Sequence, residues 1–156
     1  MTQESVITDE MRAAINVQSE PVVYDIEKGA IIKFARAIGD QNPVFTDEEA
    51  ARRSQYGGII APPTFLRSCI PGPARVKVTF PYDAVVDGGS EWEYFEPVRV
   101  GDRITVTHYL SDMFERQGKL GNMLFIVRET KYVNQYDNTV ALQRTTGISY
   151  ERPGGD

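Results

Sequence analysis

The chain has 156 residues, of which 41% are hydrophobic and 25% charged, and its formal net charge is −5. This length can bury one sizeable core without disulfide staples, and a negative charge without a basic run argues against nucleic acid as a partner. No window approaches the ~18 apolar residues that span a bilayer, and the polar, acidic start lacks the features of a secretion signal, so we expect a cytoplasmic protein with no membrane span.

One cysteine, Cys69, and one histidine, His108, limit the chemistry further. They exclude an internal disulfide and a thiolate or histidine-rich metal cluster, so we expect no metal and no cofactor. We expect a single domain over residues 1–156, with loose ends at 1–7 and 152–156.

The first predicted elements are a short strand in VVYDI (22–26) and a helix through EKGAIIKFARAIG (27–39), for which Asp25 is the expected cap. One apolar stripe along this helix follows the i, i+3, i+4, i+7 spacing; its members are Ile31, Phe34, Ala35 and Ile38. Gly39 suits the left-handed position just past a helix end.

A polar turn, GDQNPVFTD (39–47), follows this helix. Asp40 and Asn42 can bond their own backbone and hold the turn, and Asn42-Pro43 is a turn signal. Thr46 or Asp47 can then cap a short helix in DEEAARRSQ (47–55).

A loop, YGGIIAPP (56–63), leads to a third predicted helix, PTFLRSCI (63–70). Pro63 suits the first helical position, where a missing N–H costs nothing, and Pro71 and Pro73 end the segment. Its apolar residues have the spacing of a helix packed in a core.

The second half of the chain predicts strands. The strand segments are DGGSEWEYFEPV (87–98), DRITVTHYLSD (102–112), NMLFIVRETKYVN (122–134) and TVALQRTTGISY (139–150). The turn-rich stretches RQGKLGN (116–122) and NQYDN (134–138) join the last three as hairpins. Helices followed by an antiparallel meander predict an α+β fold, with helix packed on one face of the sheet.

The pairing of residues 24–65 with FEPVRVGDRITVTHYLSDM (95–113) resembles the MaoC-like, hot-dog acyl-CoA dehydratases. Within them it is similar to the FAS1-like dehydratase N-terminal class, and most of all to HadA-type, non-catalytic subunits of (3R)-hydroxyacyl thioester dehydratases. The resemblance extends from about residue 24 to residue 150. It implies a curved antiparallel sheet wrapped around a central hydrophobic helix, here residues 63–70.

Active members of this family carry G-D-x-N-P-x-H and, at the start of the central helix, A-H-G. This chain keeps the glycine, aspartate, asparagine and proline of the first motif at positions 39, 40, 42 and 43. Phe45 replaces the histidine, and Ala61-Pro62-Pro63 replaces A-H-G.

Both replacements remove chemistry that hydration of a 2-enoyl thioester needs. An acid and a base must reach the water and the α-carbon, a contribution of about 10²–10⁴ in rate, and phenylalanine can serve as neither. The enolate oxygen needs a preorganised donor, whose loss costs about 10²–10³, and proline has no backbone N–H. His108 lies on a distant strand, and no histidine is predicted near Cys69 to activate it.

The resemblance therefore implies an acyl-binding, catalytically degenerate subunit of a heteromeric (R)-specific 2-enoyl-CoA or -ACP hydratase. A homologous hot-dog chain, in a heterodimer or heterotetramer, would supply the Asp/His dyad and the oxyanion hole. The degenerate site is Asp40, Asn42 and Phe45. The candidate residues for binding the acyl-CoA or acyl-ACP thioester are Phe45, Tyr56, Gly57, Gly58, Ile60, Pro62, Pro63, Thr64 and Phe65.

Purely structural explanations of the same residues stay open. Gly57-Gly58 can be a flexible loop, and Phe65 can be a core residue. Two other functions also stay open: an autonomous homodimeric hot-dog hydratase or thioesterase that uses Asp40, and a non-enzymatic acyl-CoA-binding protein. The hot-dog fold hosts both chemistries, so fold alone does not choose between them.

Overall fold

The computed structural model describes residues 4–119 and 121–151. Its α-helices are α1 (Asp9–Ala13), α2 (Lys28–Ala37) and α3 (Glu48–Arg53), and its 3₁₀-helices are η1 (Pro43–Phe45) and η2 (Pro63–Ser68). The strands are β1 (Val22–Asp25), β2 (Ala84–Tyr94), β3 (Arg103–Gly118), β4 (Gly121–Val133) and β5 (Thr139–Tyr150).

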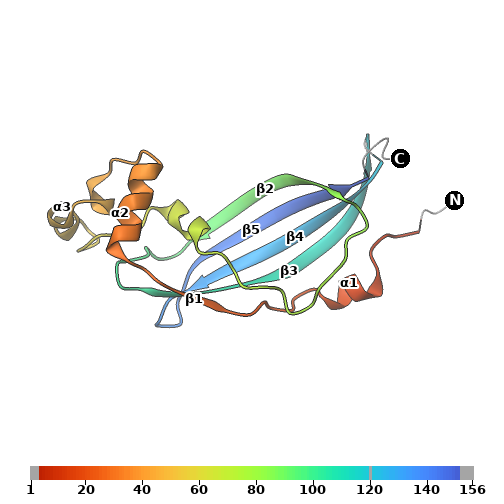
Figure 1. Ribbon diagram of the computed structural model, residues 1–156, viewed down its shortest axis with the longest axis horizontal. Helices are drawn as coiled ribbons and strands as arrows, with labels where there is room; N and C mark the ends of the chain where they lie inside the picture. Colours follow the sequence, from red (N-terminus) through yellow and green to blue (C-terminus); the bar gives the residue numbers. More distant parts are fainter. Residues whose placement is uncertain (1–3, 120, 152–156) are drawn as a thin grey trace.

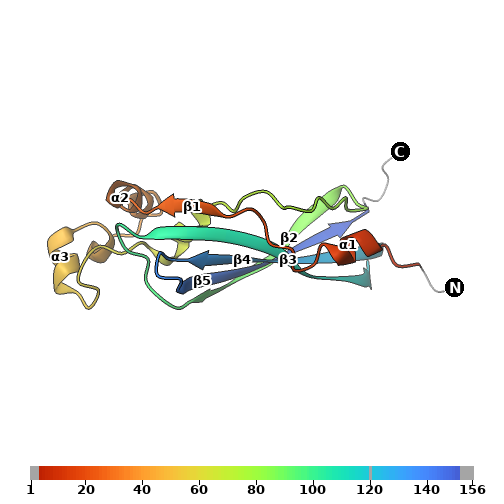
Figure 2. The same ribbon diagram turned by 90° about the horizontal axis from the view of Figure 1, so that it is seen from below.

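The strands form one five-stranded sheet in the order β1-β3-β4-β5-β2, and all the pairs are antiparallel. The predicted hairpins join β3 to β4 and β4 to β5. Figure 1 shows the long, curved strands running side by side, with α2 and α3 gathered at one end of the sheet. In Figure 2 α1 lies beside β3, away from the other helices. The predicted α+β class is confirmed.

The core has a large cluster at the helical end and a smaller one around Met11 and Leu124. On β3, Ile104 and Val106 point into the large cluster. A β-bulge between Leu110 and Asp112 then shifts the alternation, and Met113 faces the small cluster. A bulge places an extra residue on one strand, so a single strand serves both clusters.

The helix α2 follows the prediction except at its two ends. Ile31 and Ala35 are fully buried, but Ile38 is 49% exposed because the helix ends at Ala37 and the chain turns away. Asp25 is not the cap. It belongs to β1, where its carboxylate meets Arg103 at 3.1 Å, while Glu27 holds the cap position without a side-chain bond.

The predicted helix over residues 63–70 is a shorter 3₁₀-helix that ends at Ser68. The Ser68 hydroxyl donates to the Phe65 carbonyl at 2.6 Å. In an α-helix that carbonyl would accept from residue 69. The Cys69 N–H bonds the Leu66 carbonyl instead, at 3.0 Å, so the local bonds favour the tighter 3₁₀ turn.

The expected loose ends lie mostly outside the described residues, since residues 1–3 and 152–156 are not described. Residues 5–7 are held in place. The Ser5 hydroxyl and the Val6 N–H both bond the Glu115 carboxylate, and Ile7 packs on the small cluster.

Two glycines, one inside α2 and one just past its end, offer a matched pair of substitutions. Gly39 has φ +71°, as predicted, whereas Gly29 lies inside α2, and a Cβ at either position would meet no atom within 4 Å. We expect Gly39→Ala to lower the free energy of unfolding by about 1–2 kcal/mol, because left-handed backbone disfavours a Cβ. Gly29→Ala should raise it by about 0.5–1 kcal/mol through helix propensity.

Urea unfolding of both variants and the parent checks this pair, provided that the slope of the transition stays constant. Equal shifts of the same sign in the free energy of unfolding would show that backbone conformation does not decide the effect of the substitutions.

Candidate functional site

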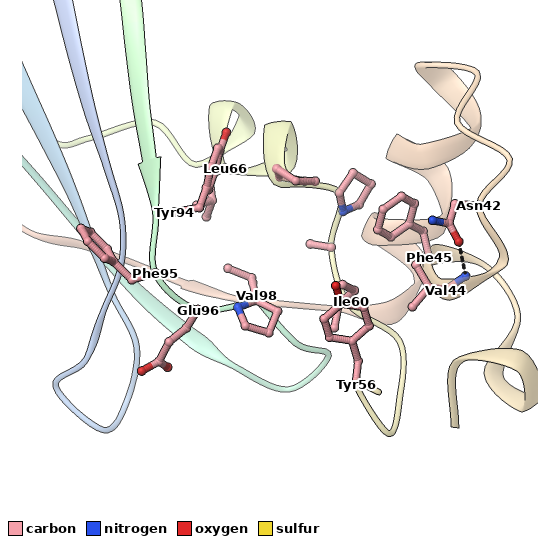
Figure 3. A pocket seen from close by; sticks show the side chains of 14 residues that line it. Asn42, Val44, Phe45, Tyr56, Ile60, Leu66, Tyr94, Phe95, Glu96 and Val98 are labelled. Atoms are coloured by element: carbon pink, nitrogen blue, oxygen red, sulfur yellow. Dashed lines mark hydrogen bonds between the residues drawn. The ribbon is translucent and has the colours of Figure 1, made fainter. Parts of the chain in front are cut away.

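A cavity of about 320 Å³ opens at the helical end of the sheet, within the size range of small-molecule sites. Most of its wall is apolar and comes from three segments far apart in sequence. The lining residues are Asn42, Val44, Phe45, Tyr56, Ile60, Ala61, Pro62, Pro63, Leu66, Tyr94, Phe95, Glu96, Pro97 and Val98. Figure 3 shows Phe45 and Tyr56 on one side of this space and Tyr94, at the end of β2, on the other.

The polar turn positions the first wall. The Asp40 carboxylate accepts the Asn42 N–H at 3.0 Å, and the Asn42 side-chain oxygen accepts the Val44 N–H at 3.1 Å and caps η1. These bonds confirm that the two side chains hold their own turn. The turn places Val44 and Phe45 in the wall, and Phe45 is only 7% exposed. Asn42 lines the cavity, whereas Asp40 does not.

The second wall, residues 60–63, offers no free backbone donor to the cavity. The Ala61 N–H donates to the Val98 carbonyl at 2.8 Å, and the Ile60 N–H donates to the Val44 carbonyl at 3.4 Å. Pro62 and Pro63 have no N–H. The stretch that carries A-H-G in active members therefore cannot hold a developing oxyanion here.

Three ionisable side chains line the cavity: Tyr56, Tyr94 and Glu96. Burial raises the pKa of Tyr94 above its ordinary value, which makes it a weaker acid. The Glu96 carboxylate points away from the cavity in Figure 3 and accepts a hydrogen bond from Asn134 at 3.2 Å. The cavity wall can hold an apolar chain, but it carries no acid–base pair suited to neutral pH.

Five of the predicted binding residues meet in this cavity: Phe45, Tyr56, Ile60, Pro62 and Pro63. The other four do not line it. Gly57 and Gly58 lie in the loop after α3, and Thr64 is exposed. Phe65 packs edge-on against Phe34, with ring centroids 5.4 Å apart, as the core alternative expected.

The sequence reasoning missed the third wall, Tyr94 to Val98. The predicted strand extended to residue 98, whereas β2 ends at Tyr94, and alternation along one strand does not say what faces its end. An isolated bridge between Ile60 and Arg99, together with the Ala61–Val98 bond, brings this segment to the loop. Leu66, from η2, closes the cavity between them.

The lone histidine and cysteine stay apart from the cavity. His108 lies midway along β3, and burial, followed by the charge of Arg128, lowers its pKa. Cys69 is buried in the large core cluster. Among residues 4–119 and 121–151, no group of three or more potential ligands could hold a metal ion, and no helix is long and apolar enough to cross a membrane.

Comparison with known proteins identifies the family to which the sequence of this chain is matched. The family model described as "FAS1-like, dehydratase domain region" matches residues 13–143. A UPF0336 protein of Streptomyces avermitilis is 44% identical over 89 residues, which are 54% of this chain and 59% of that relative. A probable enoyl-CoA hydratase alpha subunit of Thermomonospora curvata is 30% identical over 129 residues, 71% of this chain and 40% of that protein.

Two solved structures share the fold. The ChsH1-ChsH2 complex from Mycobacterium tuberculosis contains a chain that matches with a TM-score of 0.75 and 24% identity, over 88% of this chain and 86% of that one. The MaoC-like dehydratase from Rhodospirillum rubrum matches with a TM-score of 0.68 and 24% identity, over 90% and 95% of the two chains. These likenesses confirm the predicted hot-dog fold.

The labelling rate of the Cys69 thiol tests directly whether this residue is buried in the core near the cavity. Burial raises the pKa of this thiol, so the reactive thiolate is scarcer at pH 8 than for a free cysteine. We expect a disulfide-exchange reagent to label Cys69 at least ~10-fold more slowly in the folded chain than in denaturant, because labelling needs a local opening and each ~1.4 kcal/mol of opening is tenfold. Stopped-flow absorbance measures both rates, and equal rates would contradict the buried placement.

Proposed function

The chain belongs to the FAS1-like dehydratase domain region family, and on that premise we propose that it is the acyl-binding, catalytically degenerate subunit of a heteromeric (R)-specific 2-enoyl thioester hydratase. The reaction is the reversible addition of water across the 2,3-double bond of an acyl-CoA or acyl-carrier thioester. Water oxygen bonds C3, and a proton is delivered to C2. A second hot-dog chain supplies the Asp/His dyad and the oxyanion hole, as in the HadA-type arrangement.

One observation supports this proposal: the cavity has an apolar wall suited to binding but lacks the groups that the reaction needs. Phe45 stands in its wall where imidazole would move the proton, and the backbone donors of residues 60–61 are already used. Each missing function costs orders of magnitude in rate. An apolar wall without these groups still contributes about 0.8 kcal/mol for each methylene that it buries.

The role of this chain is then to hold the acyl group and to exclude water from it. Phe45 and Ile60 form the inner wall, and Tyr56 and Tyr94 are less buried. The thioester end must extend towards the partner, because the acid, the base and the oxyanion donors lie there. Binding energy gained along the acyl chain can be used to orient the thioester for reaction.

The edge of the sheet next to the cavity supports a partner of the same fold. β2 is the outer strand and pairs on one side with β5. Its apolar residues Val85 and Val86 are exposed, as are Tyr94 and Phe95 at the cavity. Unpaired strand edges with exposed apolar side chains are sites of pairing with another chain. A solved neighbour is itself a complex of two named chains, ChsH1 and ChsH2.

The direct test is a hydration assay with enoyl-CoA substrates of increasing length. The purified chain is assayed alone and then with a co-purified hot-dog chain, and turnover only after mixing is the expected result. Turnover by the chain alone would favour an autonomous homodimeric hydratase, and release of free CoA would favour a thioesterase. Acyl-CoA binding without turnover in either mixture would favour a non-enzymatic binding protein.

A substitution of Asp40 distinguishes the autonomous enzyme from the degenerate subunit. If Asp40 were the general base, Asp40→Ala would lower kcat by about 10²-fold or more. We expect a change within about twofold in the mixed complex, as for a surface residue, because Asp40 does not line the cavity and bonds its own turn. Circular dichroism confirms that the variant is folded.

Acyl binding is tested by a charge in the cavity wall. Tyr56→Glu should raise KM of the mixed complex for an eight-carbon enoyl-CoA about tenfold, the equivalent of losing roughly two buried methylenes, and leave kcat unchanged. This pattern indicates lost uniform binding. The four-carbon substrate should respond less.

The matched control for this variant is Tyr136→Glu, the same change at a 73% exposed residue of the β4–β5 turn, which should change neither constant. A drop in kcat for Tyr56→Glu with constant KM would place Tyr56 in the chemistry instead.

A further inference from the structure

A second cavity, of about 410 Å³, lies under the strap, which we define as residues 74–80, and over β3 and β4. It shares no lining residue with the first cavity. Its floor includes Leu110 and Arg128, which are paired across the two strands and so point to the same face. Val76, Val78 and Phe80 of the strap form the opposite wall.

Arg128 is the unusual residue of this cavity. Its guanidinium carbon lies 5.6 Å from the centre of the Phe80 ring, and no carboxylate or hydrogen-bond acceptor among the described residues contacts it. Arg75, Arg103 and Arg144 each meet a carboxylate. Arg36 and Arg67 meet none among the described residues, but both are exposed. Arg128 is partly buried, and burial lowers the pKa of its guanidinium.

The guanidinium nitrogens keep contact with open space. Among the described residues, no fully buried side-chain nitrogen or oxygen lacks a partner, so the unpaired donors of Arg128, which lines the cavity, are accessible to solvent. A guanidinium presents a planar fork of N–H donors that matches a carboxylate in a bidentate manner. The donors are therefore placed to receive an anion.

The rest of the lining matches an anion with an apolar body. Lys77 and His108 are the other basic residues of the wall, and no aspartate or glutamate lines it. Val76, Val78, Phe80 and Leu110 provide apolar surface on both sides of the guanidinium. One cationic fork surrounded by apolar side chains suits a monoanion with a hydrocarbon tail better than a small, multiply charged anion.

We propose that this cavity binds a small amphipathic carboxylate, whose head group pairs with Arg128 and whose tail lies between Phe80, Val78 and Leu110. The site is independent of the proposed hydratase function. Its occupant does not need a thioester, and its lining does not overlap the acyl cavity.

The test is calorimetric titration of the full chain with octanoate. Arg128→Gln, which keeps polar groups but removes the charge, should raise Kd by about tenfold or more, the usual value of a charge-assisted hydrogen bond. Arg116→Gln is the matched control, because Arg116 also lies over aromatic rings, Phe114 and Phe125, but does not line the cavity. Octanoate affinity should be unchanged in Arg116→Gln.

A second variant and three further comparisons test the octanoate site. Lys77→Glu, at an exposed strap residue, carries no risk to the core and should also weaken octanoate binding. Tyr136→Glu should not, since Tyr136 lines neither cavity. Methyl octanoate should bind far more weakly than octanoate. Inorganic phosphate that binds as tightly as octanoate, or an unchanged Kd in both charge variants, would overturn the proposal.

Discussion

The bond from the Ala61 N–H to the Val98 carbonyl is the contact on which the cavity at the helical end of the sheet depends. It joins the loop before η2 to the segment after β2, residues that are far apart in sequence. The Val100 N–H reinforces it by donating to the Ile59 carbonyl, and the Arg99 side chain donates to the Tyr56 carbonyl. A backbone amide makes one strong donation, so the bond that builds the wall also removes the donor that could have stabilised an oxyanion. The catalytic deficit has two further causes, the Phe45 ring in place of imidazole and Pro63, which has no N–H.

Local rules predicted the elements whose backbone is decided within a few residues. Asp47 accepts the N–H groups of Glu49 and Ala50 and caps α3, which settles the choice left between Thr46 and Asp47. Gly39 has the left-handed backbone that its position demanded. The strands β3 and β4 followed from alternation because one face of each is largely buried, whereas β2 is exposed along most of its length. These predictions succeeded because no distant contact competes with the local preference.

The predictions that failed are those where a distant or unseen partner decides. Asp25 has the chemistry of a cap, but Arg103 and the β3 ladder draw it into β1. The segment after Pro63 has the apolar spacing of an α-helix, but a single hydroxyl, that of Ser68, takes the carbonyl that an α-helix needs. In the site, the turn and loop residues were predictable from their motif. The Tyr94–Val98 wall was not, because only long-range pairing brings it there.

The half-buried Arg128 indicates that the sheet has a second binding place, outside the proposed acyl cavity. It lies opposite Leu110, the last β3 residue before the bulge, where the side-chain alternation changes between the two core clusters. Partly removing a guanidinium from water without a counter-charge has a cost, and even a buried ion pair can often be replaced by well-packed apolar side chains with a neutral or stabilising effect. Folding therefore gains nothing from an unpaired arginine at this position, and cation–π contact with Phe80 returns only about 0.5–1 kcal/mol at partly exposed sites. An anion that binds only the folded chain supplies the missing counter-charge and, by mass action, stabilises the fold that holds it. On this proposal the strap contributes both to the small core cluster, against which Val78 and Phe80 pack, and to the ligand site. The sheet then carries two cavities, one with an apolar wall and one with a cationic guanidinium.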